Sequence, residues 1–128
     1  MAGSLSNYAE NKILDHVVGT TSYTKPTTHL ALFTVAPTDS TAGTEATGGS
    51  YARQPLTGLF TAASSGATSN NANIDFAGMP ACTIVAIGIM DASTGGNLLV
   101  HGTLTANKVL DAGDTLRVAT GDLDITID

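Results

Sequence analysis

Residues 83–90, which read TIVAIGIM, constrain the fold of this chain more than any other segment. The run is apolar and rich in β-branched residues, and it is short enough to be a strand. Residues 91–97 follow with Asp, Ser and paired glycines, which is typical of a hairpin loop. Residues 98–105 are the predicted partner strand, so the chain contains an antiparallel hairpin.

Two further segments predict strands with different surroundings. Residues 29–35 form a nearly continuous apolar run, which is typical of a strand buried on both faces. At the end of the chain Leu123, Ile125 and Ile127 alternate with polar residues. This period of two predicts a strand with one buried face and one solvated face that runs to the last residue.

The intervening segments are less regular. Residues 51–54 and 56–60 predict a strand interrupted by Pro55, which places it at a sheet edge or a bulge. Residues 74–76 and the alternating Leu116 and Val118 predict two short strands. Residues 37–50 and 61–73 have small polar side chains and no apolar period, and they predict long exposed loops.

The N-terminal segment has a helical period instead. Residues 6–18 predict an amphipathic helix with Asn7 as N-cap and Ser6 as the competing cap, ended by Gly19. Such a short helix cannot bury its apolar stripe alone, so we expect it to dock on a sheet or on a neighbouring subunit. The stripe contains Ala9, Ile13, Leu14, Val17 and Val18.

Composition supports a fold made mostly of strands. Only 12% of the 128 residues are charged, 42% are hydrophobic and 14 are glycines. The chain is too apolar for disorder and too poorly charged for a helical bundle. We therefore predict one all-β domain over residues 1–128, with the helix at about 6–18 and the β-sheets at about 28–128. An antiparallel β-sandwich of about seven or eight strands fits best, with a barrel-like arrangement as the alternative.

Charge excludes two classes of partner. The formal net charge is −6, and the five cationic side chains are scattered singly as Lys12, Lys25, Arg53, Lys108 and Arg117. Without a basic stripe we expect no direct binding to nucleic acid, and an acidic surface argues against an anionic membrane. No segment predicts a membrane span or a signal peptide, so we expect assembly in a cytoplasm.

The sequence predicts no catalytic or metal site. His16, His29 and His101 lie far apart, without the paired spacing of metal ligands. No strand-turn-helix nucleophile motif or phosphate loop is present, and most Asp residues lie in turns that contain glycine. We therefore expect a protein that is not an enzyme and holds no cofactor or metal.

Several separated segments resemble a family of small virion proteins of tailed bacteriophages. They are residues 5–16 (LSNYAENKILDH), 23–26 (YTKP), 30–34 (LALFT), 48–54 (GGSYARQ), 89–99 (IMDASTGGNLL) and 110–114 (LDAGD). Members of this family are labelled either tail-fibre proteins or capsid cement and decoration proteins. The resemblance covers nearly the whole chain and implies a structural protein of the virion.

Of these two functions, the residues favour capsid cement. The sequence has no shaft repeats and only 5% aromatic residues, whereas a fibre that recognises host glycans typically has both shaft and aromatic platforms. We expect the domain to bridge copies of the major capsid protein and to self-associate, with a trimer as one possible arrangement. The alternative is a small tail-fibre or baseplate component involved in host attachment. Tyr51, Arg53 and Gln54 are the predicted partner-binding residues, because Tyr and Arg are enriched at binding hot spots.

Overall fold

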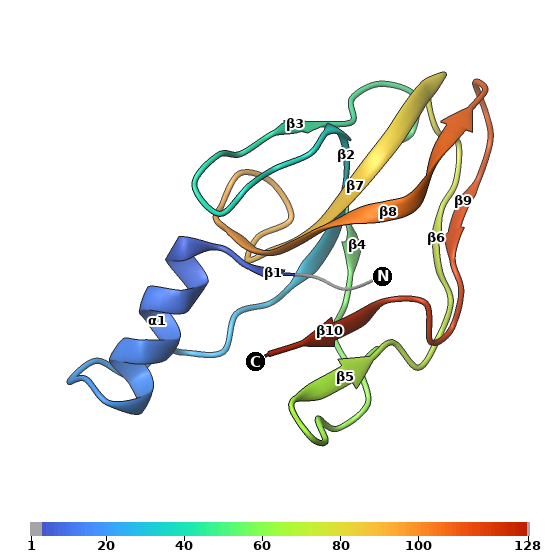
Figure 1. Ribbon diagram of the computed structural model, residues 1–128. Helices are drawn as coiled ribbons and strands as arrows, with labels where there is room; N and C mark the ends of the chain where they lie inside the picture. Colours follow the sequence, from blue (N-terminus) through green and yellow to red (C-terminus); the bar gives the residue numbers. More distant parts are fainter. Residues whose placement is uncertain (1–3, 128) are drawn as a thin grey trace.

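The computed structural model describes residues 4–127 and consists of short antiparallel strands with one helix (Figure 1). The elements are β1 (Ser4–Leu5), α1 (Asn7–Val17), β2 (His29–Val35), β3 (Thr44–Glu45), β4 (Gln54–Pro55), β5 (Ala67–Ser69), β6 (Ile74–Phe76), β7 (Cys82–Met90), β8 (Leu98–Leu110), β9 (Leu116–Val118) and β10 (Asp124–Thr126). The predicted all-β class with one N-terminal helix is confirmed. The predicted number of strands was too low, because two-residue strands show no periodicity.

The largest sheet is built around the predicted hairpin. Its strand order is β1-β8-β7-β2-β3, and β4 also pairs with β2. All of these pairings are antiparallel. Leu30 lies opposite Ile89 and Leu32 lies opposite Ile87, so β2 and β7 place their large apolar residues on the same face.

Both faces of β2 are buried, as its continuous apolar run predicts. Leu30 and Leu32 belong to the larger core, whereas Ala31 and Phe33 belong to a smaller core on the opposite face. The smaller core also contains Ala86 and Met90, and Val85 and Leu98 pack against it. Gly88 lets these side chains approach the strand closely, because an added Cβ would lie 2.7 Å from Leu98 and 2.8 Å from the Phe33 ring.

Two small ribbons form the second layer of the sandwich. β6 pairs with β9, and β5 pairs with β10, each pair antiparallel. Phe76, Leu116 and Leu123 belong to the larger core together with Leu30 and Leu32 of the main sheet. Among residues 4–127 the three sheets remain separate, so the barrel-like alternative is wrong.

Helix α1 begins at Asn7, and Ser6 caps its N-terminus. Ser6 is the N-cap in extended conformation, and its side-chain oxygen accepts a hydrogen bond from Ala9 N at 3.2 Å. The predicted Asn7 cap is wrong, since Asn7 is already helical. Gly19 follows the helix, where an added Cβ would lie 2.8 Å from the Asp15 carbonyl oxygen.

The helix leaves most of its apolar stripe uncovered. Ala9 is buried, but Val17 is 69% exposed and Val18 is 79% exposed. Figure 1 shows α1 projecting from one end of the molecule, where it packs against β1 and β8. The sheet therefore covers only the start of the apolar stripe, at Ala9. Docking of the rest of the stripe on a neighbouring subunit stays a prediction. No helix within residues 4–127 is long and apolar enough to cross a membrane.

Other predicted boundaries need correction. The predicted loops 37–50 and 61–73 contain β3 and β5, and residues 51–53 and 56–60 form no regular strand. The hairpin's second strand continues to Leu110 rather than ending at Thr105. The last strand ends at Thr126, and Ile127 is exposed; Asp128 lies outside the described residues. Short strands such as β3 and β5 could not be predicted from their small polar residues, because pairing with a distant strand, and not the local sequence, makes them strands.

Replacement of Ser6 by alanine should lower the free energy of unfolding by about 1–2 kcal/mol. The Ser6 hydroxyl caps α1 and also donates to the Leu98 carbonyl, and the residue is buried. Urea unfolding followed by circular dichroism measures the loss. Ser22→Ala, at an exposed position beyond the helix, is the control and should change stability by less than about 0.5 kcal/mol. Equal stabilities of the two variants would contradict this function of Ser6.

Candidate functional site

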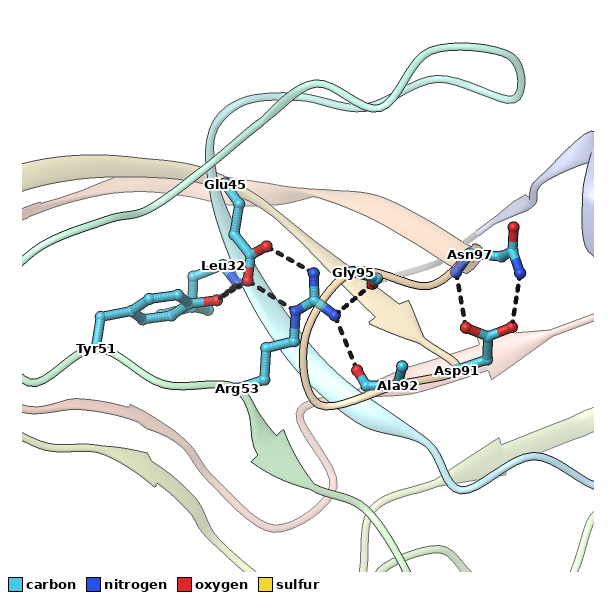
Figure 2. A network of polar contacts seen from close by, with 8 residues as sticks. All are labelled: Leu32, Glu45, Tyr51, Arg53, Asp91, Ala92, Gly95 and Asn97. Atoms are coloured by element: carbon cyan, nitrogen blue, oxygen red, sulfur yellow. Dashed lines mark hydrogen bonds and ion pairs between the residues drawn. The ribbon is translucent and has the colours of Figure 1, made fainter.

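Of the predicted partner-binding residues, Tyr51 and Arg53 lie in the segment that leads into β4, and Gln54 is the first residue of β4. This segment runs beside β3 and the loop of residues 91–97 (Figure 2). The structure brings Tyr51 and Arg53 together around Glu45 of β3. We call Glu45, Tyr51 and Arg53, with the carbonyl oxygens of Ala92 and Gly95, the Arg53 cluster.

Arg53 is the centre of the cluster. Its Nε and Nη2 donate to the two carboxylate oxygens of Glu45 at 2.9 and 2.8 Å. Its Nη1 donates to the carbonyl oxygens of Ala92 and Gly95, both at 2.8 Å. The Arg53 side chain is only 9% exposed. A guanidinium suits this position because its planar fork can hold a carboxylate and two carbonyls at once.

Tyr51 links the cluster to the core. Its hydroxyl donates to Glu45 Oε2 at 2.6 Å and accepts from the Leu32 backbone N at 3.0 Å. The ring stacks on Phe76 of β6, with centroids 6.1 Å apart and planes 12° apart. Tyr51 therefore connects the main sheet with the second layer.

The electrostatics of the cluster keep Glu45 ionised. Burial opposes the charged carboxylate, but the hydrogen bonds from Arg53 and Tyr51 outweigh burial and hold the pKa of Glu45 below its usual value. Burial and the adjacent Glu45 carboxylate raise the pKa of Tyr51 well above its usual range. The Tyr51 hydroxyl therefore stays protonated and available as a donor.

The loop of residues 91–97 is closed by a second carboxylate. Asp91 accepts hydrogen bonds from the backbone N of Asn97 at 2.7 Å and from its side-chain amide at 3.0 Å. Gly96 lies against this carboxylate, where an added Cβ would be 2.4 Å from Asp91 Oδ1. The loop thus presents its Ala92 and Gly95 carbonyls to Arg53 in a defined shape.

Sequence reasoning missed Glu45, which it placed in a long loop. No local pattern could have found it, because Glu45 meets its partners through the pairing of β3 with β2. The third predicted residue, Gln54, lies apart from the cluster in β4, and its amide donates to the Ala52 carbonyl at 3.0 Å. Binding of a partner by Tyr51, Arg53 and Gln54 stays a prediction, since their known contacts are internal.

The histidines are spread over separate parts of the fold. His16 Nδ1 accepts a hydrogen bond from the Tyr23 backbone, and His101 Nε2 lies 2.7 Å from Asp39 Oδ1. Within residues 4–127, no group of three or more His, Cys, Asp or Glu side chains could hold a metal ion.

Low pH should reduce the free energy of unfolding, in part because Glu45 becomes protonated. A carboxylate whose pKa is lowered by folding stabilises the protein above its unfolded pKa, about 4.3, and the contribution disappears as the pH falls through the folded pKa. The stability difference between the wild type and Glu45→Gln should therefore be large at pH 7 and should shrink steadily below about pH 4.3. Thermal unfolding at a series of pH values measures it.

The control for this experiment is Glu10→Gln, which removes one exposed glutamate charge from α1. Its stability should stay close to that of the wild type at neutral pH. A Glu45→Gln difference that is the same at pH 7 and at about pH 3 would contradict the prediction.

The sequence matches one known family. The family described as podophage GP4 fiber I protein gp80 matches residues 4–126, which is nearly the whole chain. Among curated proteins, none matches this sequence. The match confirms the resemblance to phage virion proteins and identifies a structural component of the virion. The chain belongs to the family of podophage GP4 fiber I protein gp80.

Proposed function

We propose that this chain is a non-enzymatic subunit of the virion fibre whose function is to bind other virion proteins. The observation that carries the proposal is the uncovered apolar side of α1, formed by Ile13, Leu14, Val17 and Val18, which we call the helix face. A helix of this length is marginal by itself and gains stability from packing of its apolar side. A helix face left open by its own domain is typical of a surface that another protein covers.

The polar residues support binding rather than catalysis. Arg53 and Glu45 form the most buried ion pair among the described residues, and Arg53 also donates hydrogen bonds to backbone carbonyls of the same chain. General acid–base catalysis needs a titratable group that is free to exchange a proton with a substrate, and Glu45 and Arg53 are already hydrogen-bonded to each other. The proposal assigns the protein no substrate and no cofactor.

Capsid cement is the second candidate. Exposed apolar residues lie both on α1, at one end of the molecule, and at Val109, near the end of β8. Such separated surfaces would let one copy bridge neighbouring subunits of the major capsid protein. The family description favours the fibre, so we place capsid cement second.

The position of the protein in purified particles separates the two candidates. Quantitative mass spectrometry gives the copy number relative to the major capsid protein, and electron microscopy of antibody-labelled particles gives the location. We expect label at the tail and a copy number far below that of the major capsid protein. Label spread over the head, with copies in proportion to the capsid protein, would overturn the fibre proposal in favour of cement.

A further inference from the structure

The side chains of the helix face form two parallel rows. Ile13 and Val17 lie one turn apart along α1, and Leu14 and the C-cap residue Val18 form the neighbouring row. Two helices pack on each other when a row of one lies between two such rows of the other. Leu14 is 58% exposed and Val17 is 69% exposed, and Figure 1 shows α1 projecting from the body of the molecule. The face is therefore open to a helix from another molecule.

Both ends of the helix face carry negative charge. Glu10 precedes Ile13 by three residues and Leu14 by four, so it lies at the start of the same side of the helix. Asp15 precedes Val18 by three residues and lies beside the end of the face. Both carboxylates are exposed, and the C-terminus of a helix adds about half a negative elementary charge. The helix face is therefore apolar in the middle and anionic at both ends.

The chain does not neutralise these two carboxylates itself. Lys12 is the only Lys or Arg of α1, and its Nζ lies 5.5 Å from the centroid of the Tyr8 ring. Lys12 and Tyr8 lie one turn apart, on the side of α1 away from the helix face. The Nδ1 of His16 accepts a hydrogen bond from the backbone of the following loop at 3.0 Å. None of the three ion pairs within residues 4–127 includes Glu10 or Asp15, so both are left for the cations of a partner.

We infer that the helix face binds an amphipathic helix of another virion protein, with Lys or Arg at both ends of the apolar strip of that helix. This inference rests on the proposed function and names the chemistry of the partner. Contact between the two apolar strips removes both from water and supplies affinity. The cations of the partner then face Glu10 and Asp15, which fixes the position of one helix along the other and supplies specificity.

A second copy of the chain does not offer such a helix. Within residues 4–127, α1 is the only helix that a second copy could contribute. If two helix faces met in antiparallel orientation, Glu10 of each copy would approach Asp15 and the negative C-terminal end of the other helix. In parallel orientation, identical carboxylates would face each other. Each copy also has a net charge of −6, so the predicted self-association would use a different surface.

Photo-crosslinking in assembled particles identifies the protein that covers the helix face. The photoreactive residue p-benzoylphenylalanine replaces Val17, and the control replaces Val109, which is 77% exposed on β8. Mass spectrometry of the crosslinked peptides gives the sequence of the segment that each position contacts. We expect position 17 to crosslink to a segment of another virion protein with helical apolar periodicity and with Lys or Arg at both ends of its apolar strip. Position 109 should not crosslink to that segment.

Two stapled helical peptides measure the charge preference of the isolated protein. The peptides share one apolar strip and carry either Lys or Glu at its two ends. Fluorescence anisotropy should give a Kd about tenfold lower for the Lys peptide, because its cations pair with Glu10 and Asp15. This preference should decrease as the ionic strength rises from about 0.1 M to about 1 M, since the Debye length falls from about 10 Å to about 3 Å.

Substitutions show whether the two carboxylates cause the preference. Glu10→Gln combined with Asp15→Asn should bind both peptides with similar Kd values. The matched control is Asp111→Asn combined with Asp122→Asn, which changes the net charge equally at exposed positions outside α1 and should keep the preference of the wild type. Leu14→Gln should weaken the binding of both peptides, because it removes apolar surface from the helix face. Circular dichroism checks that all variants remain folded.

Four results would overturn the inference. They are a crosslinked dimer of this chain through position 17, a crosslink to a segment without Lys or Arg, equal binding of the two peptides, and binding of neither peptide. The location of the protein in the virion is a separate result. A crosslink to a basic amphipathic helix of the major capsid protein would support the inference and overturn the fibre proposal. Label at the tail together with equal binding of the two peptides would overturn the inference alone.

Discussion

Replacement of Arg53 by methionine is expected to lower the free energy of unfolding by about 3–5 kcal/mol. The side chain is 9% exposed and makes four hydrogen bonds, two to Glu45 and two to backbone carbonyls of the 91–97 loop. Methionine retains an unbranched apolar stem but leaves the Glu45 carboxylate without its cation. The large loss comes from that uncompensated charge rather than from the lost attraction alone. Urea unfolding measures it.

A double-mutant cycle identifies the source of the loss. Adding Glu45→Gln to Arg53→Met removes the unpaired charge and should recover part of the stability. The control pair is Arg117 with Asp75, which has the same bidentate geometry at 2.7 and 2.9 Å but is exposed to solvent. Arg117→Met should be far milder, because solvent screens exposed pairs. Similar losses for Arg53→Met and Arg117→Met would contradict the importance of burial.

Replacement of Phe76 by alanine should also destabilise the protein by about 3–5 kcal/mol. Phe76 is 1% exposed, it comes from β6 of the second layer, and its ring stacks on Tyr51. The substitution leaves a cavity between the ribbon and the main sheet and removes the aromatic contact. Thermal and urea unfolding report the loss.

Phe76→Leu is the control for that experiment. It retains most of the apolar volume and loses the ring stacking, so its cost should be clearly smaller than that of alanine. If leucine and alanine destabilise the protein equally, cavity formation is not the cause. If neither does, the second layer does not depend on this residue.

The two effects should not be independent. Tyr51 contacts Phe76 through its ring and Glu45 through its hydroxyl, so both substitutions loosen the same tyrosine. The combined Arg53→Met and Phe76→Ala variant should therefore lose less stability than the sum of the single losses. Residues that share a partner commonly deviate from additivity in this way.

Periodicity in the sequence was sufficient for the elements that carry their own signal. The apolar run of β2, the short strand β6 and the amphipathic helix α1 are all visible locally, because burial imposes a period of two or 3.6 on the side chains. The choice of Tyr51 and Arg53 as notable residues was also possible from their types. Their internal partner Glu45 could not be predicted, because it lies in a segment without any period.

The sequence by itself therefore determined the all-β class, the central hairpin and the existence of an apolar helix stripe. Only the tertiary structure decided which surfaces stay open. The helix face is uncovered because the start of α1 is tied to β8, and β8 departs from the regular ladder because it carries extra residues opposite β7. Both features depend on register between strands far apart in the chain. Hydrogen bonds between distant segments set this register, and no local pattern of side chains encodes it.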